Sequence, residues 1–285
     1  MLHYSKWPTS SASLSPESFK ARLVFLHGMG GTGALWRPIA ATLENEYEIL
    51  APDQRGHGKS QIPTQAGGRE TPQYTPLHYG KDVIETMDAL GFHPAWLIGH
   101  SMGVRTACAA AHLKPEWVKG LVLIDLGLSG QAGGGLGDTL GNFLKILPME
   151  FNSRAEARSY MEQHCPDPSI AQYLMAVSVR TPTPDAPEKL TFPFDRAALI
   201  QTIHAARDSS VRTWVKELAS QGMPILILRG AQSLVWSKED YEKEKAHFQG
   251  APSVHFEEFE GAGHGLPFEK RLDFTRRLTN LISSY

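Results

Sequence analysis

The residue of this chain best suited to nucleophilic chemistry is Ser101. It stands at the centre of the pentapeptide GHSMG, residues 99–103, between an apolar run at 96–98 and a run typical of a helix at 104–111. Strand, sharp turn and helix form the context in which G-x-S-x-G is a nucleophile elbow, and flanking glycines leave room for such a turn because they lack a Cβ atom. The pattern predicts a serine hydroxyl exposed at a helix N-terminus; a strand–loop–helix connection with a chance serine is the alternative.

A serine hydroxyl needs a base to accept its proton, and the usual base is a histidine held by a carboxylate. The chain has 12 histidines, so their positions must select among them. His264 follows a strand-like run at 253–259, lies in a Gly-Ala-Gly-His-Gly loop, and comes after the serine and the candidate acids. We therefore predict that His264 is the base. Three other histidines are interpreted as structural: His27, His57 and His100.

A glycine-rich stretch after an early strand allows two interpretations. Residues 28–33 read GMGGTG, which fits the dinucleotide pattern G-x-G-x-x-G, and an acid, Asp53, follows about 20 residues later. However, the next helix is expected only from Trp36, and Asp53 opens a polar, glycine-rich segment rather than a ribose-binding strand end. The other interpretation is that the loop supplies a backbone N–H to an oxyanion hole. We favour the oxyanion hole, because that interpretation agrees with the serine motif.

The elements that must position these residues alternate between strands and helices. Helices are expected at 36–45, 76–90, 104–111, 237–248 and 269–283. Buried strands are expected at 22–26, 47–51, 96–98, 118–124, 224–228 and 253–259, with a short edge strand at 2–7. Such alternation predicts an α/β fold with a mostly parallel sheet flanked by helices on both faces. The polar stretches 8–18 and 61–75 are predicted to be loops.

The segment 128–208 interrupts this alternation. It begins in a glycine-rich stretch and then shows helix-like runs at 138–147, 153–164, 169–179 and 194–206, with a proline-rich break at 181–187. This is too long for one crossover, so we predict a helical lid over the carboxyl edge of the sheet. Ordinary crossover helices are the alternative. The core domain would then comprise residues 1–127 and 209–285.

Taken together, these motifs resemble those of the α/β-hydrolase-fold serine hydrolases. The motifs are HG at 27–28, DQRGHGKS at 53–60, GHSMG at 99–103 and GAGH at 261–264. The resemblance covers most of the chain outside the lid and implies the α/β-hydrolase fold. It also implies Ser101 as nucleophile, His264 as base, and an oxyanion hole formed by the N–H groups of Met29 and Met102.

The sequence departs from this family at the catalytic acid. The family usually carries an aspartate in a G-x-x-D segment, whereas the corresponding residues here, 230–233, read Gly-Ala-Gln-Ser. A serine cannot stabilise an imidazolium as a carboxylate does. Some members, including certain haloalkane dehalogenases, place the acid after the strand that follows the elbow helix, where this chain has Asp125. We predict Asp125 as the acid in preference to Asp240; a helix N-cap or loop-anchoring role is the alternative for Asp125.

The resemblance implies a carboxylesterase-like serine hydrolase that cleaves an ester or related acyl bond through an acyl-enzyme, without a cofactor or metal. Carbon–carbon bond hydrolase, thioesterase and perhydrolase activities share the triad and stay open, and a non-catalytic small-ligand receptor is an alternative of another class. Nine apolar residues are candidates for a substrate pocket under the lid, although plain core is the alternative. These residues are Met149, Phe151, Met161, Tyr173, Leu174, Met175, Phe192, Phe194 and Trp236.

The composition of the chain limits the classes of partner molecule that we expect. Net charge is −2, which gives no indication of a nucleic-acid partner. Two cysteines do not make a disulfide framework, the N-terminus lacks an apolar signal core, and no apolar run approaches membrane-spanning length. We expect a cytoplasmic protein, a monomer or homodimer, that acts on a small, ester-like and apolar molecule.

Overall fold

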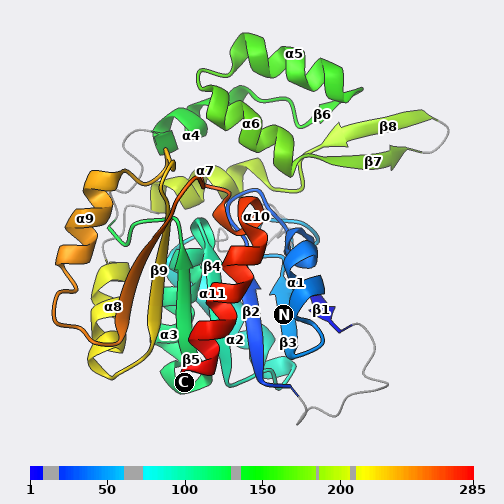
Figure 1. The fold of residues 1–285 in the computed structure, drawn as a ribbon. Helices are drawn as coiled ribbons and strands as arrows, with labels where there is room; N and C mark the ends of the chain where they lie inside the picture. The colour runs from blue at the N-terminus through cyan, green and yellow to red at the C-terminus, as the bar shows by residue number, and fades with distance from the viewer. Residues whose placement is uncertain (9–18, 61–72, 130–135, 184–185, 206–209) are drawn as a thin grey trace.

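A seven-stranded sheet forms the centre of the computed structural model, which describes residues 1–8, 19–60, 73–129, 136–183, 186–205 and 210–285 (Figure 1). The strand order is β1-β3-β2-β4-β5-β9-β10. Only β1 runs antiparallel to its neighbour, and the other pairs are parallel. The strands are β1 (Tyr4–Trp7), β2 (Ala21–Leu26), β3 (Tyr47–Pro52), β4 (Ala95–His100), β5 (Val118–Ile124), β9 (Ile225–Gly230) and β10 (Val254–Phe259).

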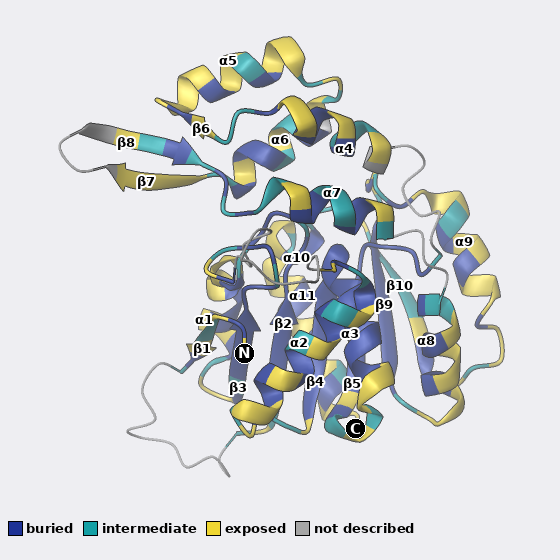
Figure 2. Ribbon diagram, turned by 180° about the vertical axis from the view of Figure 1, so that it is seen from behind, coloured by how far each residue is buried: buried dark blue, intermediate teal, exposed yellow. Residues whose placement is uncertain are grey.

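Helices cover both faces of this sheet, as the strand–helix alternation predicts (Figures 1 and 2). One face packs against α2 (Pro76–Ala89), α3 (Met102–Leu113), α8 (Ser210–Ser220) and α9 (Lys238–Ala246). The other packs against α1 (Arg37–Leu43) and α11 (Arg271–Ser283). Central strands are therefore buried on both faces, which explains why they read as continuous apolar runs rather than as alternating patterns. Short turns at η2 (Gly33–Trp36), η3 (Pro115–Trp117) and α10 (Leu266–Glu269) complete this unit.

Helix α3 lies unusually deep in the molecule. Its residues Ala107–Ala111 are wholly buried, and a Cβ atom added to Gly80 of α2 would come within 2.7 Å of the Ala110 nitrogen. Small side chains on both helices thus allow their backbones to approach closely. This packing fixes α3 and, with it, the residue that precedes its first turn, Ser101.

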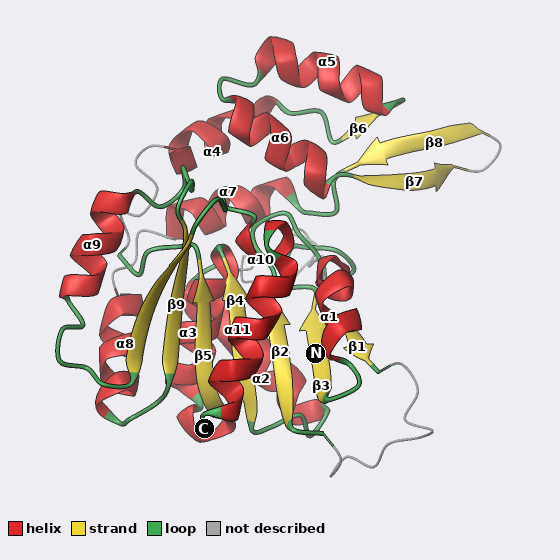
Figure 3. Ribbon diagram, in the orientation of Figure 1, coloured by secondary structure: helices red, strands yellow, loops and turns green. Residues whose placement is uncertain are grey.

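The segment between β5 and α8 lies beyond the carboxyl ends of the strands (Figure 3). It has its own cluster of buried apolar side chains, among them Phe143, Leu174 and Phe192. Its elements are α4 (Leu136–Ile146), β6 (Glu150–Phe151), α5 (Arg154–His164), α6 (Pro168–Val177), β7 (Val179–Thr183), β8 (Ala186–Thr191) and α7 (Arg196–Ala205).

The expectation of a purely helical segment, broken at 181–187, is wrong in one respect. Strands β6, β8 and β7 form a small antiparallel sheet in that order. Pro182 lies in β7, and β7 is an edge strand, where a residue without an N–H is tolerated. The prolines therefore suggested a break where the chain forms a hairpin.

Some expectations fall outside the described residues. These are most of the predicted loops at 8–18 and 61–75, and much of the glycine-rich start of the 128–208 segment. Along the described ranges, no helix combines the length and hydrophobicity needed to cross a membrane.

Candidate active site

Ser101 occupies a sharp turn between β4 and α3. Its φ and ψ angles are 54° and −120°, which is a strained conformation for a residue with a side chain. The turn is closed by close backbone contacts, because a Cβ atom on Gly99 would lie 2.2 Å from the Gly103 carbonyl oxygen. A Cβ on Gly103 would in turn lie 2.2 Å from the carbonyl oxygen of Leu26 in β2. The glycines at 99 and 103 are therefore required by the approach of backbone to backbone, as the motif predicts.

Ser101, His264 and Asp125 form a continuous chain of hydrogen bonds. The Ser101 Oγ lies 3.0 Å from His264 Nε2, and His264 Nδ1 lies 2.7 Å from Asp125 Oδ2. A carboxylate can only accept, so Nδ1 carries the proton and Nε2 is left to accept from the serine hydroxyl. These distances fit the predicted roles of a nucleophile, a general base and an orienting acid. The structure thus brings together the three residues that the sequence assigns to the triad.

Asp125 is completely buried and is held from several sides. Its backbone has a φ of 55°, in the left-handed region, and its Oδ1 accepts the N–H of Gly230 at 2.9 Å. Its Oδ2 accepts the Ser233 hydroxyl at 2.5 Å, in addition to His264. Asp240, the alternative acid, instead accepts the hydroxyl of Ser237 at the start of α9 at 2.8 Å. It is Asp125, therefore, that contacts the histidine.

The loop after β2 packs directly against the serine. A Cβ atom on Gly28 would lie 3.1 Å from the Ser101 Cβ and 3.3 Å from His100 Nδ1, so a larger residue here would crowd both side chains. Met29 follows at once, and Met102 is the first residue of α3, where the N–H groups have no acceptor within the helix. Both predicted oxyanion donors consequently belong to segments that meet at Ser101.

Two further residues, His100 and Glu269, hold the loop of His264, a role that the sequence does not predict for either. His100 Nε2–H donates to the His264 carbonyl oxygen at 2.7 Å. Glu269 accepts the N–H of Gly263 at 2.6 Å and the N–H of Gly265 at 3.1 Å. Both contacts are to backbone atoms, so no side-chain pattern in the sequence could have pointed to them. They fix the backbone on both sides of the imidazole.

The remaining strand-end histidines are buried and neutral, in keeping with their structural interpretation. His27 Nδ1–H donates to Gly28 O at 2.7 Å, and its Nε2 accepts the Gln54 N–H at 3.0 Å. His57 Nδ1–H donates to Arg55 O at 2.9 Å. Burial lowers the pKa of His27 to about 4 and those of His57 and His100 to about 3.

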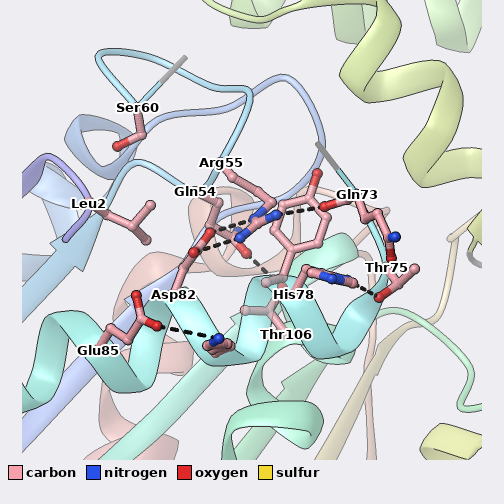
Figure 4. A network of polar contacts seen from close by, with 12 residues as sticks. Leu2, Gln54, Arg55, Ser60, Gln73, Thr75, His78, Asp82, Glu85 and Thr106 are labelled. Carbon is pink, nitrogen blue, oxygen red and sulfur yellow. Dashed lines mark hydrogen bonds and ion pairs between the residues drawn. The ribbon is translucent and has the colours of Figure 1, made fainter. Parts of the chain in front are cut away.

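Side-chain hydrogen bonds fasten the segment 53–60 beside the site (Figure 4). Arg55 forms a two-pronged ion pair with Asp82 of α2, at 2.5 and 2.7 Å. Gln54 donates to His27 O at 2.6 Å and accepts the Thr106 hydroxyl of α3 at 2.6 Å. The segment thereby ties the end of β2 to both helices that pack behind the serine.

Asp53, the acid of the dinucleotide pattern, is also engaged within the chain. Its carboxylate accepts the N–H of Gly33 at 2.8 Å and that of Lys59 at 3.0 Å, so it joins two loops. A Cβ atom on Gly33 would lie 2.1 Å from the Ala51 carbonyl oxygen, which gives this glycine a packing role. Asp53 and Gly33 therefore have structural roles in this loop. In the described part of the chain, no group of three or more His, Cys, Asp or Glu side chains is placed to hold a metal ion.

Three of the predicted pocket residues, Met149, Phe194 and Trp236, do not lie together. A Cβ atom on Gly30 would lie 3.3 Å from the Phe194 ring, so Phe194 reaches the loop that carries Met29, and Met149 packs against the same apolar cluster as Phe194. Trp236 belongs to the cluster on the α3 and α8 face, edge-on to Tyr241 at 5.3 Å between ring centroids. Its position after β9 placed it near the site in sequence, but its side chain turns into the core.

Comparison with known proteins agrees with this geometry. Residues 21–271 match the family described as alpha/beta hydrolase fold. A candidate esterase/lipase of Haemophilus influenzae is 27% identical over 248 residues, which cover 87% of this chain and 78% of that protein.

Two solved structures share the architecture. A crystal structure of E-2-(acetamidomethylene)succinate hydrolase aligns with a TM-score of 0.73 and 23% identity, over 92% of this chain and 91% of that one. An esterase from a marine microorganism aligns with a TM-score of 0.73 and 20% identity, over 98% of both chains. With the family matched over nearly the whole length, and with the strand–turn–helix around Ser101 in place, this chain belongs to the alpha/beta hydrolase fold family.

Proposed function

We propose that this protein is a serine hydrolase that cleaves a carboxylic ester, or a related acyl bond, of a small molecule through an acyl-enzyme. The observation that carries the proposal is the hydrogen-bonded chain from Ser101 through His264 to the buried Asp125. The esterase/lipase name of the Haemophilus influenzae relative supports the same class of reaction.

In the proposed mechanism His264 Nε2 accepts the hydroxyl proton as the Ser101 oxygen attacks the carbonyl carbon. Asp125 stabilises the imidazolium that forms, because its carboxylate accepts the Nδ1 proton at 2.7 Å. The N–H groups of Met29 and Met102 donate to the oxyanion, and one such donor contributes on the order of 3 kcal/mol to transition-state stability. His264 then gives its proton to the leaving alcohol.

A water molecule completes the reaction from the same position. His264, again neutral, removes a proton from the water as it attacks the acyl carbonyl. The second tetrahedral intermediate uses the same oxyanion donors, and its collapse returns the proton to Ser101 and releases the acid. No step in this scheme calls for a metal ion or an organic cofactor.

We further propose that the 128–208 segment is a lid and that it selects apolar substrates. Phe194 reaches the loop of Met29, and the loop after β3 is bonded to this segment, since the Gly58 N–H donates to Pro193 O at 2.7 Å and the Asp195 N–H donates to Gly56 O at 2.7 Å. Met29 packs against two apolar clusters, and such surroundings beside the proposed oxyanion hole favour an apolar acyl or alcohol group.

Hydrolysis of p-nitrophenyl esters of increasing acyl length tests the proposal. We expect hydrolysis by the unaltered protein and a loss of at least about a thousandfold in Ser101→Ala, because the nucleophile is absent. Ser284→Ala, at an exposed serine near the C-terminus, is the matched control and should keep full activity. Full activity of Ser101→Ala would contradict the proposal. Ligand binding without any ester or thioester hydrolysis would favour a receptor.

A further inference from the structure

Ser233 makes an unusual contact within the proposed triad. Its hydroxyl lies 2.5 Å from Asp125 Oδ2, which is the same oxygen that accepts from His264 Nδ1. Oδ1 of the carboxylate is occupied separately by the N–H of Gly230 at 2.9 Å. One oxygen of the acid therefore serves two donors, and one of these two donors is the base itself.

The direction of the Ser233 hydroxyl is fixed by its surroundings. Its Oγ lies 3.2 Å from the backbone N–H of Val235 and 3.4 Å from that of Trp236, and both N–H groups donate to it. With these two donors directed at the oxygen, the hydroxyl proton is left to point at the carboxylate. The side chain is also buried, at 5% exposure, so water does not compete for the contact.

We infer that Ser233 is a positioning residue that acts on His264 through Asp125. The inference rests on the proposed function, in which His264 is the base. The hydroxyl holds Oδ2 in line with Nδ1, and it takes up part of the carboxylate's negative charge. Both effects determine how strongly the Asp125 carboxylate attracts the Nδ1 proton of His264. Without the hydroxyl, the carboxylate attracts that proton more strongly, and His264 becomes neutral and able to act as a base only at higher pH.

Other charged and titratable groups near the pair come from four elements. They are His100 from β4, the Arg229–Glu258 ion pair from β9 and β10, and Glu269 from α10. His100 stays neutral above pH 5, since burial lowers its pKa to about 3. None of these groups bonds to the Ser233 hydroxyl. Removing that hydroxyl therefore changes one charge-assisted contact of Asp125, together with the two bonds from the Val235 and Trp236 N–H groups, and leaves the contacts of the charged groups in place.

The test is the pH profile of serine reactivity in Ser233→Ala. The probe is a fluorophosphonate, and the pseudo-first-order rate of Ser101 labelling is measured between pH 5 and pH 9. This rate rises with the fraction of neutral His264 and requires no knowledge of the natural substrate. We expect the midpoint of the profile to move upward by about 0.5 to 1 pH unit in Ser233→Ala. Ser233→Thr keeps the hydroxyl and should keep the original midpoint.

Ser253→Ala is the matched control. Ser253 is also buried, and its hydroxyl donates to Ala219 O at 3.1 Å. It precedes β10, at the end of the sheet opposite the triad. A purely structural role for Ser233 predicts that both alanine variants lower the urea midpoint of unfolding and leave the labelling midpoint unchanged, and this outcome would overturn the inference. Should Ser233→Ala not fold, Ser233→Cys, with its weaker donor, must shift the midpoint in the same direction by a smaller amount. Absence of Ser101 labelling in the unaltered protein would instead count against the proposed function itself.

Discussion

Three buried histidines predict how this protein loses stability in acid. His27, His57 and His100 are 1%, 0% and 8% exposed, and burial is the largest cause of their lowered pKa values of about 4, 3 and 3. Unfolding returns each imidazole to water, where its pKa is near 6.5. Between pH 6.5 and those lowered values the unfolded chain binds more protons than the native one, so stability is present above pH 6.5 and is lost as the pH falls.

The magnitude follows from proton linkage. Each histidine that is charged only in the unfolded chain removes about 1.4 kcal/mol of stability per pH unit. Three such groups remove about 4 kcal/mol between pH 6 and pH 5. A typical domain has a total stability of about 5–15 kcal/mol, so we expect these three groups to remove a large part of the stability of this protein before the pH falls to about 4.

The variant His57→Gln measures the contribution of one of these histidines to the pH dependence of stability. The Nε2 of His57 has no partner among the described residues, and the bond from its Nδ1 to Arg55 O can be replaced by one from an amide N–H. We expect the loss between pH 6 and pH 5 to fall from about 4 to about 3 kcal/mol, whatever the variant's stability at neutral pH.

The assay is urea unfolding at pH 6.0 and pH 5.0, followed by far-ultraviolet circular dichroism. His247→Gln, at an exposed histidine of α9's C-terminal end, is the control and should leave the pH dependence unchanged. If His57→Gln and the unaltered protein showed the same pH dependence, or if stability were equal at both pH values, the buried histidines would not be the cause of acid destabilisation.

Three further predictions concern single contacts. Asp125→Asn should lower turnover of p-nitrophenyl esters by three to four orders of magnitude, because the amide no longer holds the imidazole tautomer or its charge. Gly103→Ala should strongly reduce both activity and thermal midpoint, because its Cβ would lie 2.2 Å from the Leu26 carbonyl oxygen. Tyr173→Phe should keep or raise the free energy of unfolding, by up to about 1 kcal/mol, since the buried hydroxyl has no partner among the described residues.

Each of these has a control and an opposing outcome. Asp240→Asn should retain turnover, and the reverse pattern would move the acid to position 240. Gly141→Ala meets only ordinary contact, at 3.6 Å from Ile203, and should be tolerated; equal damage from both alanines would contradict the steric argument. A Tyr173→Phe protein destabilised by more than about 1 kcal/mol would show that the hydroxyl has a partner.

The sequence was most informative where chemistry and backbone geometry coincide. Gly99 and Gly103 are required by backbone contacts, so the pentapeptide predicted the strand–turn–helix around Ser101 as well as its hydroxyl. The parallel sheet followed from strands that are apolar on both faces. The prediction of Asp125 as the acid depended on the family resemblance, because Ser233 stands at the position where the family usually has the acid. In the structure the two side chains are hydrogen-bonded to each other.

Other features of the fold and the site depend on contacts that cannot be predicted from local sequence patterns. Strands β7 and β8 pair around prolines that suggested a break, and Trp236 turns into the core although it follows a site-forming strand. His100 and Glu269 act on the backbone of the His264 loop, which is distant from His100 in sequence. The role of the 128–208 segment as a lid stays a prediction.

The most direct test of Ser101 as the nucleophile is to identify the residue that reacts with a fluorophosphonate. The protein would be incubated with one equivalent of the reagent, digested, and analysed by mass spectrometry while ester hydrolysis is followed in parallel. We expect a single phosphonyl group on Ser101 and a loss of activity in proportion to labelling. A label on another residue, or full ester hydrolysis by protein completely labelled at Ser101, would contradict this assignment.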